Sequence, residues 1–356
     1  MPFLFLLLPL AALATFGASL LIPGNFAFNL VSGVALIGAV IASVHHAEVI
    51  AHRIGEPFGT LMLALSVTII EVALIVSMMM LADGADKATL ARDTIFSTIM
   101  IIANGVIGLC LLVGGIMHRE QSHLVEGAGP SLSVLVTLAT LTLVLPSFTT
   151  SAPGSSYTTA QLAFDAVASL ALWGVFIFGQ TVRHRDYFLP PSHVDDEATH
   201  APPPSAREAW ISFALLLVSL VSVVGLAKAL SPSIEAAVAS AGAPQAVIGI
   251  AIAMLVLAPE TLAALRSAMA NRLQTSMNLA LGSALASIGL TIPAVALVSV
   301  WMGLPLVLGL EGKDLVLLVL TFVVSAITLG SARTTIMQGA VHLVIFAAFL
   351  FLALVP

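Results

Sequence analysis

Two glutamates, Glu71 and Glu260, stand near the middle of long apolar runs. An ionised carboxylate at the centre of a bilayer costs roughly 2.5–3.5 kcal/mol on insertion scales, so such residues usually line a cavity and handle ions or protons. Two facing carboxylates repel each other when both are ionised, and a bound cation removes that repulsion. Cations and protons would then compete for the same oxygens, and the pair would titrate as one unit. The alternative is that either glutamate stays protonated and hydrogen-bonds a neighbouring helix.

Further oxygen-bearing groups stand close to both glutamates in the sequence. Ca²⁺ takes about 6–8 oxygen ligands, so two carboxylates need neighbours to complete a site, although each neighbour could instead bond its own helix backbone. Thr68 lies one helical turn before Glu71 and would share its helix face. Pro259, which precedes Glu260, removes a backbone hydrogen bond and frees the carbonyl oxygen of Leu255. The other candidate ligands are Ser97, Thr98, Asn104, Asn278, Ser283 and Ser287.

The composition indicates that membrane helices position these residues. Hydrophobic residues make up 59% of the chain and charged residues 8%, against about 25% charged in a typical soluble domain. A membrane barrel would need alternating segments of about ten residues, so the chain is predicted to be an all-α polytopic membrane protein. Small residues are common, and Gly105, Gly108 and Gly282 would allow close helix approach. The single cysteine, Cys110, excludes an intrachain disulfide, and the net charge of −6 does not favour nucleic acid as a partner.

Eleven apolar runs are long enough to span a bilayer. The first lacks a preceding positive region and is about 20 residues long, so it is interpreted as a transmembrane helix rather than a cleaved signal peptide. The predicted spans are 3–22, 27–50, 57–82, 94–117, 130–148, 160–181, 209–230, 244–268, 275–300, 313–330 and 335–355.

A hydrophilic stretch divides these spans into an extra first helix and two sets of five. The predicted organisation is an extra helix over 1–25, a five-helix repeat over 26–182, a cytoplasmic acidic and proline-rich loop over 183–208, and a second five-helix repeat over 209–356. Five helices per half would give the second repeat an inverted topology, which is common in transporters. The loop is interpreted as a solvated linker, with a metal-sensing segment as the alternative because it holds His184, His193 and His200 and the triplet Asp195, Asp196 and Glu197.

The distribution of Lys and Arg favours a cytoplasmic position for this loop. With that orientation, eight basic residues lie inside and four lie outside, and the C-terminus is outside. The inner set is Arg53, Arg119, Arg183, Arg185, Arg207, Arg266, Arg272 and Arg333, and the outer set is Lys87, Arg92, Lys228 and Lys313.

A second polar group lies at the inner end of the second helix. His45, Glu48 and His52 follow an i, i+3, i+7 spacing, which predicts a route for protons into the membrane or a pH sensor. A polar cluster at the membrane interface is the alternative. Glu48 and Asp165 both fall within a turn or two of a membrane face, and His342 is interpreted as a histidine satisfied by its surroundings.

The segments around the two glutamates resemble the ChaA-like bacterial branch of the calcium/proton antiporters, in the cation/Ca²⁺ exchanger superfamily. The first segment reads HAEVIAHRIGEPFGTLMLALSVTIIEVALI (46–75) and the second APETLAALRSAMANRLQTSMNLALGSALASIGLTIP (258–293). The positions that match the family without a gap are Gly55, Gly59 and Glu71 in the first segment and Glu260, Gly282, Ser283 and Pro293 in the second.

This resemblance implies eleven helices and a metal site between the two repeats, with the glutamates as shared ligands for cations and protons. The chain departs from the Gly-Asn-Ala-x-Glu pattern of general exchangers, because it reads Val-Thr-Ile-Ile-Glu at 67–71 and Val-Leu-Ala-Pro-Glu at 256–260. The fourth helix has no clear match to the family's Gly-Ser pair. These departures concern the neutral oxygens, and therefore the choice of cation.

The function expected is secondary antiport of Ca²⁺ and H⁺ in a bacterial inner membrane, with Na⁺/H⁺ or K⁺/H⁺ exchange as the nearest alternative. No phosphate-binding Gly-x-x-x-x-Gly-Lys-Ser/Thr run is present, so an ion gradient would supply the energy. A cation channel and an intramembrane enzyme are more distant alternatives, and the run HHAEVIAH (45–52) lacks the His-Glu-x-x-His spacing of metalloproteases. The expected partners are inorganic cations, protons and membrane lipid, with no resident cofactor and an oligomeric state that the sequence leaves open.

Overall fold

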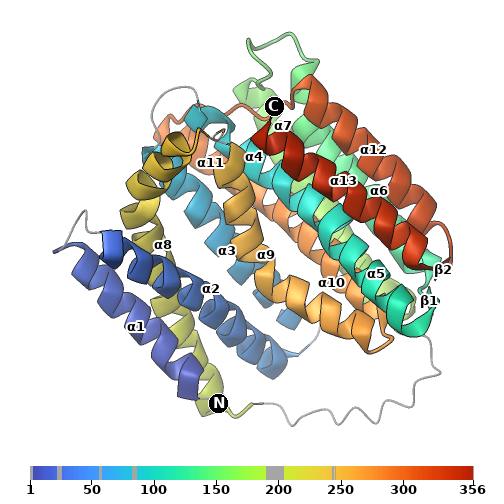
Figure 1. Ribbon diagram of the computed structural model, residues 1–356, viewed down its shortest axis with the longest axis horizontal. Helices are drawn as coiled ribbons and strands as arrows, with labels where there is room; N and C mark the ends of the chain where they lie inside the picture. Colours follow the sequence, from blue (N-terminus) through green and yellow to red (C-terminus); the bar gives the residue numbers. More distant parts are fainter. Residues whose placement is uncertain are drawn as a thin grey trace. The chain divides into compact units, whose positions relative to one another are not determined.

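A computed structural model describes residues 3–21, 26–55, 58–81, 86–189, 204–242, 244 and 246–355 of the chain (Figure 1). The helices are α1 (Phe3–Ser19), α2 (Phe26–Ile54), α3 (Phe58–Leu81), α4 (Asp86–Met100), α5 (Ile107–His118), α6 (Val125–Ala139), α7 (Thr159–Phe178), α8 (Ala206–Ser240), α9 (Ala246–Met269), α10 (Leu273–Ala286), α11 (Ile292–Met302), α12 (Gly312–Leu329) and α13 (Ile336–Leu354). Four π-helical turns are η1 (Ile101–Val106), η2 (Thr140–Val144), η4 (Gly179–Arg183) and η6 (Ser287–Thr291). The remaining elements are the 3₁₀ turns η3 (Leu145–Ser147) and η5 (Arg185–Tyr187) and the strands β1 (Gln121–Ser122) and β2 (Arg333–Thr334).

The helices account for all eleven predicted spans. In the described ranges, nine helices are long and apolar enough to cross a membrane, and two shorter apolar helices are Phe3–Ser19 and Ala64–Met80. The π turns η1 and η6 join α4 to α5 and α10 to α11, so Ala88–His118 and Leu273–Met302 are each one continuous span. The prediction of an all-α polytopic membrane protein is confirmed.

The chain forms two compact units. Unit 1 comprises Met1–Leu90 and Asp196–Val256, and unit 2 comprises Ala91–Asp195 and Leu257–Pro356. Helices α4 and α9 each pass from one unit into the other. The inverted repeats and their boundaries stay a prediction, and the acidic triplet, His193 and His200 lie outside the described residues.

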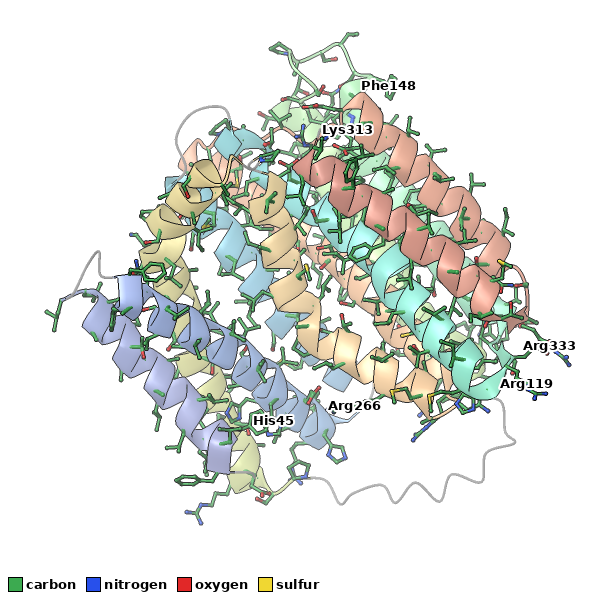
Figure 2. All side chains as sticks on the ribbon, in the orientation of Figure 1. His45, Arg119, Phe148, Arg266, Lys313 and Arg333 are labelled. Carbon is green, nitrogen blue, oxygen red and sulfur yellow. The ribbon has the colours of Figure 1, made fainter. Side chains whose placement is uncertain are left out.

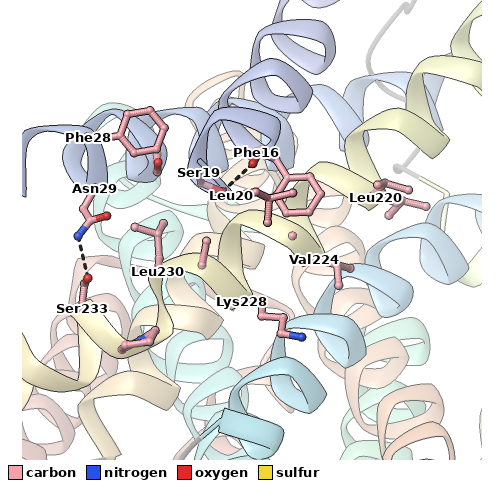
Figure 3. Close-up of a pocket in the computed structure, with 15 residues that line it drawn as sticks. Phe16, Ser19, Leu20, Phe28, Asn29, Leu220, Val224, Lys228, Leu230 and Ser233 are labelled. Carbon is pink, nitrogen blue, oxygen red and sulfur yellow. Dashed lines mark hydrogen bonds between the residues drawn. The ribbon is translucent and has the colours of Figure 1, made fainter. Parts of the chain in front are cut away.

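Unit 1 is built on α2, which packs against α1, α3 and α8. Gly225 of α8 lies against the ring of Phe16 in α1, and an added Cβ would overlap that ring. Asn29 of α2 donates a hydrogen bond to Ser233 of α8 at 2.8 Å (Figure 3). These contacts border a largely apolar cavity of about 920 Å³ between α1, α2 and α8, which Lys228 also lines.

Unit 2 has a seam of glycines where α5 and α13 run side by side (Figure 1). A Cβ added to Gly108 would lie 2.9 Å from the His342 Cβ, and one added to Gly339 would overlap the backbone of Leu112. The close approach predicted for Gly108 is therefore confirmed, and Gly105 lies against the Phe346 ring, 3.3 Å from an added Cβ. The prediction of close approach at Gly282 is wrong, because an added Cβ there would meet no atom of the described residues within 4 Å.

A short antiparallel ribbon closes one end of unit 2. Strand β1 pairs with β2, with Gln121 opposite Thr334. Gln121 is buried and donates to the carbonyl oxygen of Ala268 at 2.8 Å, which ties the ribbon to the end of α9. Figure 2 shows Arg119 and Arg333 at this end of unit 2 and Lys313 at its opposite end, while the predicted inner and outer sides stay a prediction.

The imidazole of His123 is buried beside the last turn of α12. Its side chain is 3% exposed, and Nε2 lies 3.3 Å from the carbonyl oxygen of Leu329. Burial lowers the pKa of His123 below its ordinary value of 6.5, while the contact with Leu329 acts in the opposite direction. Below that pH the unfolded chain binds more protons at this group than the folded protein does, so stability is lost as the pH falls.

The variant His123→Gln is therefore expected to flatten the fall in thermal stability of the purified protein below about pH 6.5. Glutamine keeps a donor near Leu329 and does not titrate. The matched control is His184→Gln, since the His184 ring is exposed and stacks on Tyr187. Melting curves recorded from neutral to mildly acidic pH check the effect. Equal acid sensitivity in His123→Gln and wild type would show that this group is not responsible.

Candidate cation site

The first glutamate lies on α3 in unit 1. Glu71 is 1% exposed, and Thr68, one turn earlier, is 5% exposed. Both side chains are thus buried on a helix whose other buried residues are mostly apolar, such as Ile70, Leu74 and Ile75. The predicted pairing of a carboxylate and a hydroxyl on one face of a transmembrane helix agrees with this placement.

The second glutamate lies on α9, close to the point where that helix passes into unit 2. Glu260 is half-buried, and its Oε2 atom is buried. Pro259 stands inside α9, which stays helical on both sides of it. Thr261 donates to the carbonyl oxygen of Leu257 at 2.7 Å, so its hydroxyl is used within the helix. Glu260 and the proline-bearing turn are the features that could serve an ion here.

The hydroxyl groups of Ser97 and Thr98, adjacent on α4, differ in their hydrogen bonds. Ser97 is 2% exposed, and its Oγ donates to the carbonyl oxygen of Asp93 at 2.6 Å. Thr98 is 1% exposed, and its Oγ1 has no hydrogen-bond partner among the residues that the structure describes. A buried hydroxyl without a partner is costly, so Thr98 is the stronger ligand candidate of the two.

The amide of Asn104, on η1, is committed to a buried network. Its Nδ2 donates to Oγ1 of Thr321 at 2.9 Å, and its Oδ1 lies 3.1 Å from Nδ1 of His342. The other ring nitrogen of His342 lies 3.0 Å from Oγ1 of Thr328. The interpretation of His342 as a satisfied histidine is confirmed. A ligand role for Asn104 would require these bonds to break.

The candidates on α10 and η6 have unequal surroundings. Asn278 donates to the carbonyl oxygen of Phe188 and accepts from Gln274, so its amide anchors the chain that follows η5. Ser283 is half-buried, and Ser287 is 3% exposed at the start of η6. The Asn278 amide is thus committed to this anchor, and Ser283 and Ser287 are the remaining ligand candidates on this span.

Proteins of known sequence place these helices in a family. The sodium/calcium exchanger protein family matches residues 24–182 and 211–355, which include both glutamates. The chain belongs to this family. This exchanger is 51% identical to the protein y4hA of Sinorhizobium fredii over 330 residues, covering 92% of this chain and 88% of that one. It is 37% identical over 349 residues to the sodium-potassium/proton antiporter ChaA of Escherichia coli, covering 98% of this chain and 94% of that one.

Solved structures share the fold of the exchanger. A structure of native YfkE has a TM-score of 0.73 at 18% identity and covers 99% of this chain and 100% of its own. A crystal structure of the H⁺/Ca²⁺ exchanger CAX has a TM-score of 0.70 at 14% identity and covers 97% of this chain and 87% of its own. The predicted resemblance to cation exchangers is confirmed, as is the prediction of a transporter rather than an enzyme.

The i, i+3, i+7 spacing of His45, Glu48 and His52 predicted one polar group at the end of α2, but these side chains have different surroundings. The ring of His45 stacks on Phe5 of α1, with ring centroids 3.8 Å apart, and its Nε2 is buried. Glu48 and His52 are both exposed. The neighbouring His46 lies 3.0 Å from the carbonyl oxygen of Phe5 through Nε2. The exchanger thus uses His45 and His46 to hold α1 against α2, and a role of the group in proton movement stays a prediction.

Asp165 is a buried acidic residue that the sequence did not single out as a functional candidate. Asp165 was expected within a turn or two of a membrane face, and the structure finds its side chain 2% exposed on α7. Ser169 and Trp173 follow it at intervals of four residues on the same helix face. That i, i+4, i+8 spacing in an otherwise apolar helix was the available signal for this part of the exchanger.

Proposed function

We propose that the exchanger is a secondary active cation/proton antiporter of a bacterial inner membrane, which exports Ca²⁺ in exchange for H⁺. Glu71 and Glu260 are the carboxylates for which cation and protons compete. The observation that carries this proposal is the burial of an acidic side chain, Glu71 at 1% exposure, within an apolar helix of a chain from an exchanger family.

Charge balance supports a divalent cation at two carboxylates. Two ionised carboxylates neutralise one Ca²⁺, and two protons neutralise them equally well. Both loaded states are then neutral in the apolar interior, whereas the empty ionised state is strongly disfavoured. Alternating access follows, because the protein changes conformation more readily with the carboxylates neutralised than with two bare charges in the membrane. Protons delivered from the outer side displace the cation there, and the cation displaces protons on the inner side.

The relatives favour two different cations. ChaA of Escherichia coli, at 37% identity, is a sodium-potassium/proton antiporter, whereas CAX, which shares the fold, is an H⁺/Ca²⁺ exchanger. Na⁺/H⁺ or K⁺/H⁺ exchange is therefore the second candidate function. Neutral oxygens decide between them, since Ca²⁺ needs a larger set of oxygen ligands than the carboxylates supply. The neutral oxygens proposed here are those of Thr68, Thr98, Ser283 and Ser287.

The proposed exchange is tested in everted membrane vesicles whose interior is more acidic than the medium, with a proton-sensitive dye that reports the pH gradient. Addition of Ca²⁺ is expected to collapse the gradient at lower concentration than Na⁺ or K⁺. A response to Na⁺ or K⁺ alone would replace Ca²⁺ by the second candidate. Cation uptake without any proton movement would contradict antiport and indicate a channel.

The contrast between Thr98 and Asn104 separates a ligand from a structural residue. Thr98→Val keeps the side-chain shape and is expected to raise the half-saturating cation concentration about tenfold, equivalent to about 1.4 kcal/mol, with little loss of thermal stability. Asn104→Leu leaves Nδ1 of His342 without its side-chain partner and removes the hydrogen bond to Thr321, so it is expected to cost about 1–3 kcal/mol of folding stability.

Dye-based exchange assays and melting curves on both variants check this contrast. Ser97→Ala is the matched control for Thr98→Val, because the Ser97 hydroxyl is occupied by a backbone carbonyl. Unchanged cation affinity in Thr98→Val would remove Thr98 from the proposed ligands. Undiminished stability in Asn104→Leu would remove the structural assignment of Asn104.

A further inference from the structure

A buried carboxylate of unit 2, Asp165, has no part in the function proposed above. Asp165 of α7 is 2% exposed. Its Oδ1 accepts a hydrogen bond from Oγ1 of Thr142, on η2, at the long distance of 3.5 Å. Its Oδ2 is buried and has no hydrogen-bond partner among the described residues. A buried acidic group with one long hydrogen bond is costly unless it holds a proton or other groups complete its shell.

Two more buried polar atoms continue from Asp165 along α7. Ser169 is fully buried, and its Oγ has no partner within the described part of the chain. Nε1 of Trp173 is likewise buried without a partner there. Residues four apart on a helix lie above one another, so the three side chains form one stripe. We call Asp165, Ser169 and Trp173 the α7 stripe.

The described elements that pack against α7 carry few charged residues. Helix α7 packs against α6, η4, η6 and α11; η6 and α11 carry no titratable residue, and the one charged residue of η4, Arg183, is exposed beyond the C-terminal end of α7. The one acidic residue of α6, Glu126, lies in its first turn, at the other end from η2. Burial, together with the Asp165 carboxylate, raises the pKa of Tyr157 to about 12, and its hydroxyl donates to the carbonyl oxygen of Leu141 at 2.6 Å. The ion pairs of the described residues lie elsewhere, at Arg92 and Arg333.

The spacing of the stripe matches water bridges rather than direct bonds. Four residues of α-helix rise about 6 Å, and neighbouring stripe atoms make no direct bond to each other within the described part of the chain. Two hydrogen bonds of about 2.8 Å through one water molecule span nearly the same distance. Each such water would have at least two polar partners in the protein, as buried waters require. Bridging waters would satisfy all three atoms of the stripe.

We propose that Asp165 is a proton-binding carboxyl of unit 2 and that water molecules along α7 join it to Ser169 and Trp173. An indole N–H can donate a hydrogen bond but cannot accept one. We call Asp165, Ser169, Trp173 and the waters that join them the water file. Its hydrogen bonds therefore start at the Trp173 N–H and are donated in the direction of Asp165, and protons cannot pass beyond the indole. Gly289 of η6 packs against the base of the Trp173 side chain, since an added Cβ there would lie 2.7 Å from the Trp173 Cβ. The water file thus ends at the indole, and Asp165 is its one proton-binding carboxyl.

This site is separate from the proposed competition at Glu71 and Glu260. It lies six residues after the start of α7, about 9 Å along the helix, in the half that begins beside Tyr157. Its tests read proton and water binding directly, so they stand whether or not the two glutamates exchange a cation.

The proton on Asp165 is tested by infrared difference spectroscopy on the full-length protein in lipid, with aspartate labelled by ¹³C at its carboxyl carbon. The label separates aspartate bands from those of the glutamates. Wild type is expected to show a labelled carboxylic-acid band in the acid-minus-alkaline spectrum that is lost in Asp165→Asn. The control Asp186→Asn, at an exposed residue, should retain it. An unchanged band in folded Asp165→Asn would overturn the assignment.

The water file is tested with the carboxyl group left in place. Ser169→Ala is expected to shift the labelled acid band to a higher wavenumber, because the carboxyl loses a water-mediated hydrogen bond. Hydroxyl-radical footprinting of the wild type, which marks side chains beside bound water, is expected to oxidise Trp173 several-fold faster than it does in the Ser169→Val variant. An unshifted band in Ser169→Ala, or equal Trp173 oxidation in wild type and Ser169→Val, would overturn the water file.

Discussion

Glu71→Gln and Glu260→Gln are each expected to abolish cation-driven proton movement, a loss of at least about tenfold, since hydrogen bonds and ligands at charged groups are worth about 1.5–3 kcal/mol. Glutamine keeps the size of the side chain and one carbonyl oxygen. It cannot carry the exchanged proton or supply a negative charge to the cation. Dye quenching in everted vesicles measures the loss for each cation.

A matched control for these variants is Glu120→Gln. Glu120 is exposed at the end of unit 2 and lies 3.4 Å from the guanidinium of Arg333, so it carries a surface ion pair. Surface pairs contribute little to stability, and this variant is expected to exchange at the wild-type rate. Near-normal exchange in either Glu71→Gln or Glu260→Gln, at equal protein amounts, would refute the two-glutamate mechanism.

Gly339→Ala is expected to destabilise unit 2 strongly for a change of one methyl group. An added Cβ would overlap the backbone nitrogen of Leu112 and lie 2.9 Å from the carbonyl oxygen of Gly108. Backbone atoms cannot turn aside as a flexible side chain can, so α5 and α13 must separate. Overpacking of this kind typically costs about 1–3 kcal/mol, more than the roughly 1 kcal/mol that alanine gains over glycine in a helix.

Gly174→Ala is the matched control for that change. Gly174 also lies inside a transmembrane helix of unit 2, but an added Cβ there would meet no atom within 4 Å. Its replacement should leave the melting temperature unchanged or raise it slightly, through helix propensity. Equal melting temperatures for Gly339→Ala and wild type would show that the seam between α5 and α13 is looser than described.

The spans were predictable because bilayer thickness and apolar composition are properties of local sequence. The least accurate end was that of α8, predicted at residue 230 and observed at Ser240. Ser231 and Pro232 read as a helix end, yet the helix continues through them. Proline interrupts one backbone hydrogen bond, and in membrane helices neighbouring side chains and helices compensate for it. Such compensation depends on the packed structure and is not visible in the sequence.

The two membrane carboxylates, Glu71 and Glu260, were also predictable from the sequence. Which of the candidate neutral oxygens remain available to bind an ion was not. Ser97 and Thr98 are adjacent, and Asn104 is six residues further on, yet each has a different fate. Ser97 bonds its own helix, the Thr98 hydroxyl has no partner among the described residues, and Asn104 bonds Thr321, more than 200 residues away along the chain. Hydrogen bonds between distant helices decide which oxygens remain for an ion. In the same way, the spacing of His45, Glu48 and His52 did not reveal that Phe5 stacks on the first of them.

Competition between cation and protons is tested most directly by counting the protons released when a cation binds. Calorimetry on the purified full-length exchanger, in buffers of different ionisation enthalpy, gives that number for whichever of Ca²⁺, Na⁺ and K⁺ drives exchange best. Wild type is expected to release protons on binding, each single glutamine variant fewer, and the double variant Glu71→Gln/Glu260→Gln none. Tight cation binding by wild type with no proton release, and an affinity independent of pH, would contradict competition at these two carboxylates.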